Sequence, residues 1–305
     1  MTSQTDMIRR DASGSPTTPA GRRRARRGEE GRALLGLSHI ALAIWAVLVI
    51  VPILFTFIGA FKSDQEITNG SMLALPHVWH FDAWGRAWTT AHIGRYMLNT
   101  IVIVFFSTFG TMLLGSMAAY VLARFKFVGN RIIYLMFVSG MTFPVFLALV
   151  PLFSIVKSVG LLFTYPGIIL VYIAYSLPFT VFFMVAFFKT LPSTVAEAAA
   201  IDGCGHTRTF FQIMLPMAKP GLISITIFNV IGQWNQYLLP TVLLSGAPDK
   251  WTITQGIASI NTNAGAAADW SGLFAALSLA IIPVIIVYII FQRQIQSGLT
   301  AGAVK

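Results

Sequence analysis

Long stretches without a charged side chain are the feature that most constrains this chain. Taking each interval between consecutive Asp, Glu, Lys or Arg residues, six intervals enclose between 23 and 31 uncharged residues. Each is long enough for the roughly 20 residues with which a helix crosses a hydrocarbon core. We therefore expect an all-α, polytopic integral membrane protein with six transmembrane helices. The expected spans are Ile40 to Phe61, Leu98 to Leu122, Ile132 to Ile155, Gly167 to Phe188, Leu222 to Leu244 and Leu273 to Phe291.

The composition favours a membrane protein over a soluble one. Hydrophobic residues make up 56% of the 305 residues and charged residues only 10%, against roughly 25% charged in soluble domains. The mean hydropathy is +0.73. The single cysteine, Cys204, excludes an intramolecular disulfide framework and a multi-cysteine metal site. Soluble secreted proteins and nucleotide-binding folds are therefore disfavoured.

The distribution of Lys and Arg predicts the orientation, because cationic residues near span ends are retained on the cytoplasmic side. With the N-terminus inside, the cytoplasmic segments hold 16 of the 21 Lys and Arg residues. The outer loops hold only Lys62, Arg86, Arg95, Lys157 and Lys250. We expect a multi-pass protein of the inner or plasma membrane, surrounded by membrane lipid, with both termini in the cytoplasm.

Residues 1–36 combine Ser, Thr, Pro and Gly with the arginine-rich run Arg22 to Arg27. Such a segment cannot bury enough apolar surface to fold alone. We therefore expect a disordered, basic cytoplasmic tail, followed by a six-helix transmembrane domain over residues 37–305. An arm that binds nucleic acid and a clamp for anionic lipid are alternative uses of the charge, but a topology determinant beside the first span is favoured, without a nucleic-acid partner. Cleavage as a signal peptide is disfavoured, because the apolar stretch is too long.

The six expected spans contain no Asp, Glu, Lys or Arg. Ion-coupled carriers usually place ionisable groups at membrane depth, and the chain has no phosphate-binding G-x-x-x-x-G-K-[ST] loop. Uphill transport would therefore take its energy from another subunit. No nucleophile elbow, catalytic carboxylate pair or zinc-binding H-E-x-x-H helix is present, so we expect no catalytic residue, no cofactor and no enzymatic activity. A secondary carrier and a scaffold or receptor that binds without translocation remain competing hypotheses.

Polar, uncharged side chains gather in the fifth expected span. Asn229, Gln233 and Gln236 recur at helical spacing and share one face, and Tyr237 lies beside them. Amides beside aromatic rings suit an uncharged, hydroxyl-rich solute, so these four residues are candidates for a substrate pathway. Amides also bond helices to one another in membranes, and from this span alone that structural role is favoured.

The outer loop between Lys62 and Arg95 carries His77, His80 and His92 with three tryptophans. Asp82 could add a fourth metal ligand. The spacing matches no closed zinc pattern, and Trp is common at a membrane interface, so we expect no metal site. A docking surface for an outer partner fits this loop better.

The cytoplasmic loop over residues 189–221 predicts a pair of short helices. Thr194 and Glu197 have the spacing of a capping box and predict the start of an alanine-rich helix. Gly203 can end this helix by taking a positive φ. By themselves these residues favour an ordinary amphipathic turn at the membrane surface.

The second helix of this loop is expected from His206 to Leu215, where Pro216 stops it. Its apolar stripe would pack on the membrane domain. The stripe consists of Phe210, Phe211 and Met214.

This loop resembles the E-A-A signature of the permeases of binding-protein-dependent ABC importers, which reads E-A-A-x-x-D-G and then, after about nine residues, I-x-L-P. The two parts stand here as Glu197 to Gly203 and Ile213 to Pro216, with matching spacing. Further segments are similar to the carbohydrate branch of maltose-permease type, and the resemblance extends from about residue 37 to the end. These segments are Phe61 to Ser63 with Gln65 to Ile67, Trp234 to Leu238, and Gly298 to Lys305.

The resemblance implies the ABC importer permease fold and a set of partners. The helix in the loop would couple to a cytoplasmic ATP-binding-cassette ATPase dimer, which hydrolyses the ATP. A second homologous permease subunit would complete the pathway, and an extracytoplasmic binding protein would deliver a sugar, as a disaccharide or oligosaccharide. ATP-driven closure would turn the cavity outward as a rigid-body switch. The implied ATPase-coupling residues are Glu197, Ala198, Ala199, Asp202, Gly203, Leu215 and Pro216.

Two positions depart from the family's pattern. Cys204 replaces the alanine that is common after D-G, and Gln236 stands where a glutamate is frequent after W-N. The second departure makes solute specificity harder to transfer, and the sequence does not name the sugar.

Overall fold

The computed structural model describes residues 20–71, 74–263 and 269–303, and the side-chain environment of residues 35–71, 74–260 and 269–294. No strand occurs among the described residues, so this part of the chain is all-α. The chain divides into two compact units, the first ending at Leu54 and the second beginning at Phe55.

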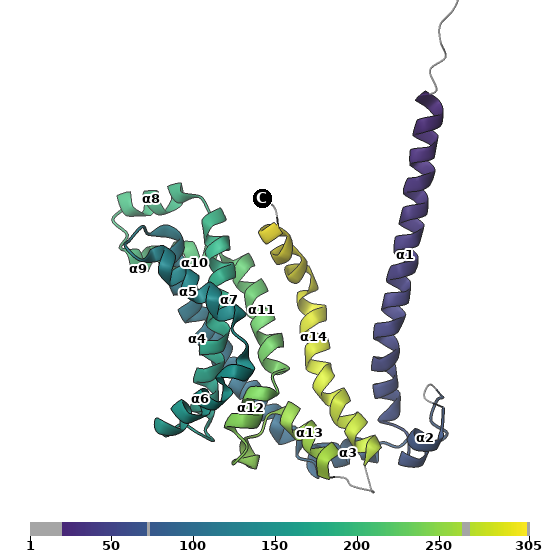
Figure 1. The fold of residues 1–305 in the computed structure, drawn as a ribbon. Coiled ribbons are helices and arrows are strands. Elements are labelled where there is room, and N and C mark those ends of the chain that lie inside the picture. The colour runs from purple at the N-terminus through teal and green to yellow at the C-terminus, as the bar shows by residue number, and fades with distance from the viewer. Residues whose placement is uncertain (1–19, 72–73, 264–268, 304–305) are drawn as a thin grey trace, which may run out of the picture. The chain divides into compact units, whose positions relative to one another are not determined.

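Helix α1, Ala20–Gly59, makes up the described part of the first unit and continues into the second (Figure 1). Its segment Leu35–Gly59 is long and apolar enough to cross a membrane, in agreement with the first expected span. Residues 20–36 are helical, although they belong to the tail expected to be disordered. Arg, Ala and Glu, which are strong helix formers, make up 11 of these 17 residues, although four are Gly. Residues 1–19 of that tail lie outside the described residues.

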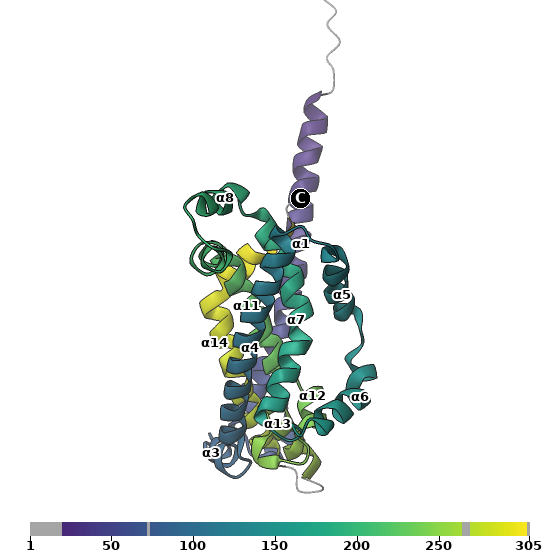
Figure 2. The same cartoon turned by 90° about the vertical axis from the view of Figure 1, so that its left-hand side faces the viewer.

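Three long helices run through the second unit: α4 (Ile93–Arg124), α7 (Tyr165–Thr190) and α14 (Trp270–Ala303). Each is long and apolar enough to span a membrane, as the sequence predicts. Helix α4 lies along α7, and α11 (Lys219–Trp234) packs against α4, α7 and α14 (Figure 2). Gly115 allows the close approach of α4 and α7, because a Cβ there would lie 2.6 Å from Thr180 Cγ2.

The third expected span is a bent pair of helices, so the prediction of one continuous helix is wrong. Helix α5, Asn130–Thr142, and α6, Val145–Ser158, meet at an angle of 106°. Pro144 disfavours the helical conformation at the preceding residue, and Phe143 is extended with φ −76° and ψ 122°. With each bent pair counted as one crossing, the described residues offer up to six spans.

The fifth expected span, Leu222 to Leu244, is also not one helix. Helix α11 ends at Trp234, and a short helix α12, Leu238–Leu243, follows after three residues. Asn235 closes α11 by donating its backbone N–H to the carbonyls of Gln233 and Ile231. The absence of charge predicts an apolar environment but not helix continuity, and the uncharged run extends beyond the end of the helix.

The short elements gather at the two ends of the second unit (Figures 1 and 2). One end carries α8 (Ser193–Ile201) and α9 (His206–Thr209), and we term it the α8 end. The opposite end, termed the α3 end, carries α2 (Asp64–Asn69), α3 (Asp82–Thr89), α12, the 3₁₀ helix Pro248–Lys250 and α13 (Ile253–Asn263).

A buried apolar cluster joins the α8 end to the long helices. It takes side chains from α4, α7, α11 and the loop between α7 and α11, so the loop over residues 189–221 is packed onto the helical core. Its buried members are Ala119, Tyr120, Leu122, Val181, Met184, Val185, Phe188, Phe210, Met214, Ala218 and Ile225.

Candidate functional site

Helix α8 carries the E-A-A residues and begins two residues earlier than the capping box predicts, at Ser193 and not after Thr194. Pro192 precedes its first residue, Ser193, and makes no side-chain cap. The predicted capping box of Thr194 and Glu197 is therefore wrong: Thr194 lies inside the helix, because Pro192 already holds the entering backbone at φ −61°.

Gly203 ends α8 with φ +76°, as predicted. The N–H of Cys204 donates to the carbonyl of Ala199 at 2.9 Å, and the N–H of Gly203 donates to that of Ala200 at 3.1 Å. This is the hydrogen-bond pattern of a Schellman motif, whose left-handed position favours glycine. The turn after α8 is therefore fixed by its backbone.

The exposed side of α8 carries Glu197 and Ala198, and Asp202 and Gly203 beyond it are exposed as well. Ala199 is only 4% exposed and faces the protein, so its side chain is not on that surface. The sequence analysis missed Ile201, which is 87% exposed and one helical turn beyond Glu197. An isoleucine on a polar surface was readable in the sequence, but only the fold shows that nothing within the described residues covers it.

The second helix of the loop does not stop at Pro216. Helix α9 is followed by a π-helical turn, Phe210–Met214, and by α10, Leu215–Met217, which includes the proline. Phe210 and Met214 are buried, as predicted, whereas Phe211 is 42% exposed and does not belong to the buried stripe.

Aromatic rings fasten this helix to the long helices. The ring of Phe210 lies 5.1 Å from that of Tyr120 on α4 and 6.4 Å from that of Phe188 on α7, measured between centroids. Arg124 at the end of α4 donates from Nη2 to the carbonyl of Leu191, 2.7 Å away, just before α8. Leu215 is half-buried and Pro216 exposed.

A cavity of about 430 Å³ lies between the α5–α6 bend, α7 and α11. Three of the four pathway candidates, Asn229, Gln233 and Gln236, line it together. Tyr237 is 47% exposed and is not among the lining residues. The remaining lining residues are Gly140, Met141, Phe143, Tyr172, Tyr175, Ser176, Pro178, Phe179, Phe228 and Gly232.

The two buried amides bond α11 to its neighbours. Gln233 Oε1 accepts from Ser107 Oγ at 2.5 Å and from Thr108 Oγ1 at 3.1 Å, and Gln233 Nε2 donates to Ser176 Oγ at 3.0 Å. Asn229 Nδ2 donates to Thr180 Oγ1 at 2.9 Å. These bonds join α11 to α4 and α7, which is the structural role that the span alone favoured, while both residues also line the cavity.

Helix α7 supplies cavity residues that the sequence analysis missed. Tyr172 and Ser176 line the cavity, and Thr180, which accepts from Asn229 but does not line it, follows at the same spacing of four residues, so the three share one face of α7. The hydroxyl of Tyr172 is buried without a hydrogen-bond partner among the described residues. The spacing of these hydroxyls was a readable signal, but only the fold shows which face of α7 meets α11.

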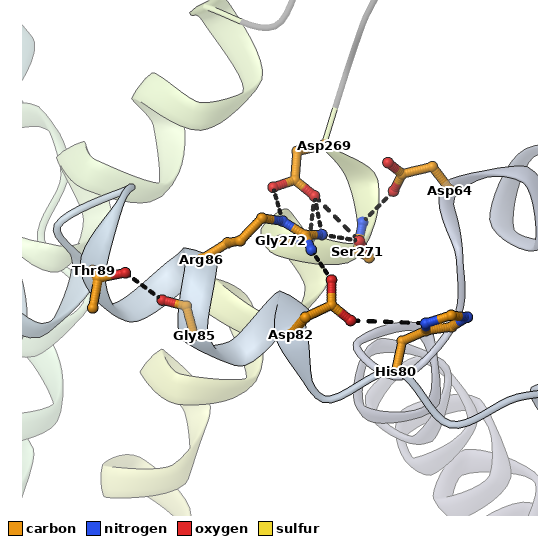
Figure 3. A network of polar contacts seen from close by, with 9 residues as sticks. All are labelled: Asp64, His80, Asp82, Gly85, Arg86, Thr89, Asp269, Ser271 and Gly272. Carbon is orange, nitrogen blue, oxygen red and sulfur yellow. Dashed lines mark hydrogen bonds and ion pairs between the residues drawn. The ribbon is translucent and has the colours of Figure 1, made fainter.

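The α3 end is tied together by charged groups (Figure 3). Arg86 on α3 donates from Nε to Asp269 Oδ2 at 3.1 Å and from Nη2 to Asp269 Oδ1 at 2.9 Å. It also pairs with Asp82, and its Nη2 donates to Ser271 Oγ at 2.8 Å. The backbone N–H of Ser271 donates to Asp64 Oδ1 at 2.9 Å, so α2 joins the network.

These contacts shift the ionisation of both partners. The hydrogen bonds from Arg86 hold the pKa of Asp269 below its ordinary value, and those to Asp269 raise the pKa of Arg86.

The histidine-containing loop of the sequence analysis contributes one contact here: His80 Nδ1 lies 3.7 Å from Asp82 Oδ1. Across the part of the chain that the structure describes, no three His, Cys, Asp or Glu side chains gather as metal ligands.

A multi-pass helical bundle with a loop of this kind is the fold of an importer permease. The model of the family described as binding-protein-dependent transport system inner membrane component matches residues 111–300. The chain belongs to this family, and the all-α permease fold and the resemblance inferred from the sequence are confirmed.

Two relatives and one solved structure illustrate the similarity. The chain is 48% identical over 274 residues to the diacetylchitobiose uptake system permease protein NgcG of Streptomyces coelicolor, with 90% of each chain covered. It is 34% identical over 270 residues to the trehalose transport system permease protein SugB of Mycobacterium tuberculosis, covering 86% of this chain and 97% of the relative. A bacterial ABC transporter involved in the import of the acidic polysaccharide alginate matches with a TM-score of 0.75 and 25% identity, over 87% of this chain and 97% of that one.

Proposed function

We propose that this chain is the permease subunit of an ATP-binding-cassette importer that moves an uncharged sugar into the cell. The observation that carries the proposal is the loop at the α8 end. It presents Glu197, Ala198 and Ile201 on one exposed surface, and a backbone turn at Gly203 and packed aromatic rings hold it on the long helices. A loop of this kind transmits force from another protein to the helices on which it rests.

The proposal includes three partners and an orientation. An ATP-binding-cassette ATPase dimer binds the exposed surface of α8, a second homologous permease subunit completes the pathway, and an extracytoplasmic binding protein delivers the sugar to the α3 end. The α8 end and both termini then face the cytoplasm. The excess of Lys and Arg in the segments assigned to that side supports this orientation.

The cavity supports an uncharged sugar as the solute. Its polar lining consists of amides and hydroxyls, its walls include aromatic rings, and no Asp, Glu, Lys or Arg is among the lining residues. Its volume of about 430 Å³ lies within the roughly 300–1,000 Å³ of small-molecule sites. Gln236 and the α7 residues Tyr172, Tyr175 and Ser176 are the solute contacts that we propose, and Asn229 and Gln233 line the same cavity. The names of the two relatives, for diacetylchitobiose and trehalose, support a disaccharide.

Two glycines in the α8 loop provide a matched test of coupling. Gly203 has φ +76°, whereas Gly205 has φ −68°, and no atom lies within 4 Å of a Cβ built on either residue. Gly203→Val therefore strains the turn, and Gly205→Val does not. In liposomes containing the complete importer, we expect Gly203→Val to lower sugar uptake per ATP hydrolysed by about tenfold, as a strain of 1–2 kcal/mol implies. Wild-type uptake per ATP in Gly203→Val would contradict the coupling role of this loop.

Purification of the assembled complex tests class and solute together. We expect an ATPase and a sugar-binding protein to co-purify with the chain, and ATP hydrolysis by the complex to be stimulated by a neutral disaccharide but not by a uronic acid or a sugar phosphate. Accumulation of a solute by the isolated polypeptide in liposomes, without any other subunit, would overturn the proposal.

A further inference from the structure

The helix that leads from α9 towards α11 contains one widened turn. Over Phe210–Met214 it is π-helical, and the N–H of Leu215 donates to the carbonyl of Phe210, five residues earlier. On either side the bonds are of the α type: Phe210 N–H donates to His206 O, and Ala218 N–H donates to Met214 O at 2.9 Å. A π-turn enclosed by α-helix is uncommon and is frequent at functional sites.

Pro216 provides the physical cause of the widened turn. In a regular α-helix a proline offers no N–H to the carbonyl four residues earlier, here that of Gln212, and its ring clashes with that carbonyl. Widening the preceding turn moves the carbonyl away from the ring. Pro216 is exposed, so its effect on the backbone, not burial of its ring, accounts for its influence on the helix.

The widened turn sets the rotation of α9 about the helix axis. Phe210, Met214 and Ala218 are all buried in the apolar cluster at the α8 end. In an uninterrupted α-helix, residues eight apart are displaced by about 80° around the axis, so Phe210 and Ala218 would lie near opposite edges of one apolar stripe and not in line. The extra residue in the π-turn compensates for this drift. Closing the turn to α geometry would rotate α9 by about 100° relative to α10.

We propose that Pro216, by holding this π-turn, is a positioning residue that orients α8 towards the ATPase. The inference rests on the proposed function, because α8 is taken as the coupling helix. The path is short: α8 packs against α9 across the turn at Gly203, and α9 continues directly into the π-turn. Rotation of α9 therefore turns Glu197 and Ile201 away from the direction in which they now point.

Deletion of one residue gives a test that a stability effect alone does not mimic. Pro216→Ala allows the turn to close and rotates α9, whereas Pro216→Ala combined with deletion of Gln212 gives an α-turn with the original rotation, since a π-turn holds one residue more than an α-turn. Gln212 is exposed and suits deletion, because its side chain accepts only from Arg208 Nε among the described residues, at 2.9 Å. Gln212→Ala is the control for loss of that contact.

In liposomes with the complete importer, we expect Pro216→Ala to lower uptake per ATP by about fivefold, corresponding to about 1 kcal/mol. The double variant should return to within about twofold of the wild type, and Gln212→Ala should match it. Deletion of Gln212 with Pro216 retained should be at least as defective as Pro216→Ala, because the proline then clashes. A nitroxide on Cys204, the chain's single cysteine, should shift its distance to a label on the ATPase in Pro216→Ala and recover it in the double variant.

Full coupling in Pro216→Ala, or a defective double variant beside a normal Gln212→Ala, would overturn the inference. The double variant decides the matter even where Pro216→Ala does not assemble. Failure of the proposed function is distinguishable, because then the wild-type complex itself would show no ATP-dependent uptake.

Discussion

The α3 end of the second unit is tied by charged side chains, whereas the α8 end is tied by aromatic packing and backbone hydrogen bonds. Three Arg–Asp ion pairs among the described residues lie at the α3 end, as does the contact of His80 with Asp82. The pairs are Arg86–Asp82, Arg86–Asp269 and Arg95–Asp249. At the α8 end the cations contact neutral groups. Arg124 donates to a carbonyl, Arg208 to the Gln212 side chain, and Lys189 lies 5.7 Å from the ring centroid of Tyr134.

The two kinds of contact suit two different tasks: charged pairs hold distant segments of the chain together, and packed rings can pass a displacement from one helix to the next. The pair of Arg86 and Asp269 joins α3 to the start of α14, two elements 183 residues apart, so it fixes the packing of distant segments. The loop that carries α8 instead rests on close-packed rings, which can transmit a displacement because protein interiors are dense and hardly compressible. The α8 end should therefore respond to changes in side-chain volume, and the α3 end to changes in charge and pH.

Removal of the central ring at the α8 end should have the largest effect. Phe210→Ala leaves a cavity between α4, α7 and the loop that carries α8. We expect it to lower the free energy of unfolding by about 3 kcal/mol and, under the proposed function, to reduce uptake per ATP. Thermal unfolding of the purified importer in detergent measures the first effect, and vesicle uptake the second.

Phe211→Ala is the matched control, because this neighbouring ring is exposed and lies outside the buried cluster. It should change the free energy of unfolding by no more than about 1 kcal/mol. Equal effects of the two substitutions would remove the contrast between the two ends, since the α8 end would then not depend on its packed rings.

The spans were predictable from charge, but their interruptions required other signals. An uncharged run reports the environment of a segment, so α4, α7 and α14 were located correctly. The bend at Phe143 was readable from Pro144, because the residue before a proline avoids helical geometry. The end of α11 at Trp234 was not readable from charge, because Asn235 closes the helix inside the same uncharged run.

The candidate site was only half predictable for a similar reason. The left-handed turn at Gly203 follows from local backbone chemistry and was predicted. The cavity has walls from three separate segments, so one span could not reveal that Tyr172 and Ser176 face Gln233. In the sequence, Pro216 predicted the end of a helix. In the structure the helix continues through Pro216, and the turn before the proline is π-helical. A rule based on the proline alone does not predict this widened turn.

Loss of charge at the α3 end should have a smaller effect. Asp269→Asn removes the charge of a two-pronged pair whose side chains are each 40% exposed. Solvent screening limits the expected loss to about 1 kcal/mol of unfolding free energy, measured on the same detergent-purified complex. Asp249→Asn is the control: its pair with Arg95 is longer, at 3.7 Å, and more exposed, so its loss should be close to zero. A larger loss in Asp249→Asn than in Asp269→Asn would contradict the importance of the Arg86 network.

Acid should weaken the α3 end selectively, with the smallest of these effects. The pKa of Asp269 is lowered chiefly by hydrogen bonds from Arg86, and that of Glu66 by the backbone N–H groups of Ser63 and His77. A carboxyl with a lowered pKa in the folded protein stabilises the fold above its ordinary pKa of about 4, because the unfolded chain takes up the proton first. This stabilisation is lost as the pH falls through the lowered folded value.

The midpoint of thermal unfolding should therefore decrease below about pH 4, with a slope that becomes shallower in Asp269→Asn and shallower again when Glu66→Gln is added. Phe210→Ala should shift the whole curve downward without changing that slope, because no carboxyl contributes to its cluster. The opposite result would be an unchanged slope in Asp269→Asn and Glu66→Gln and a flattened slope in Phe210→Ala. It would contradict the attribution of acid sensitivity to the α3 end, since titrating groups at the α8 end would then govern acid stability.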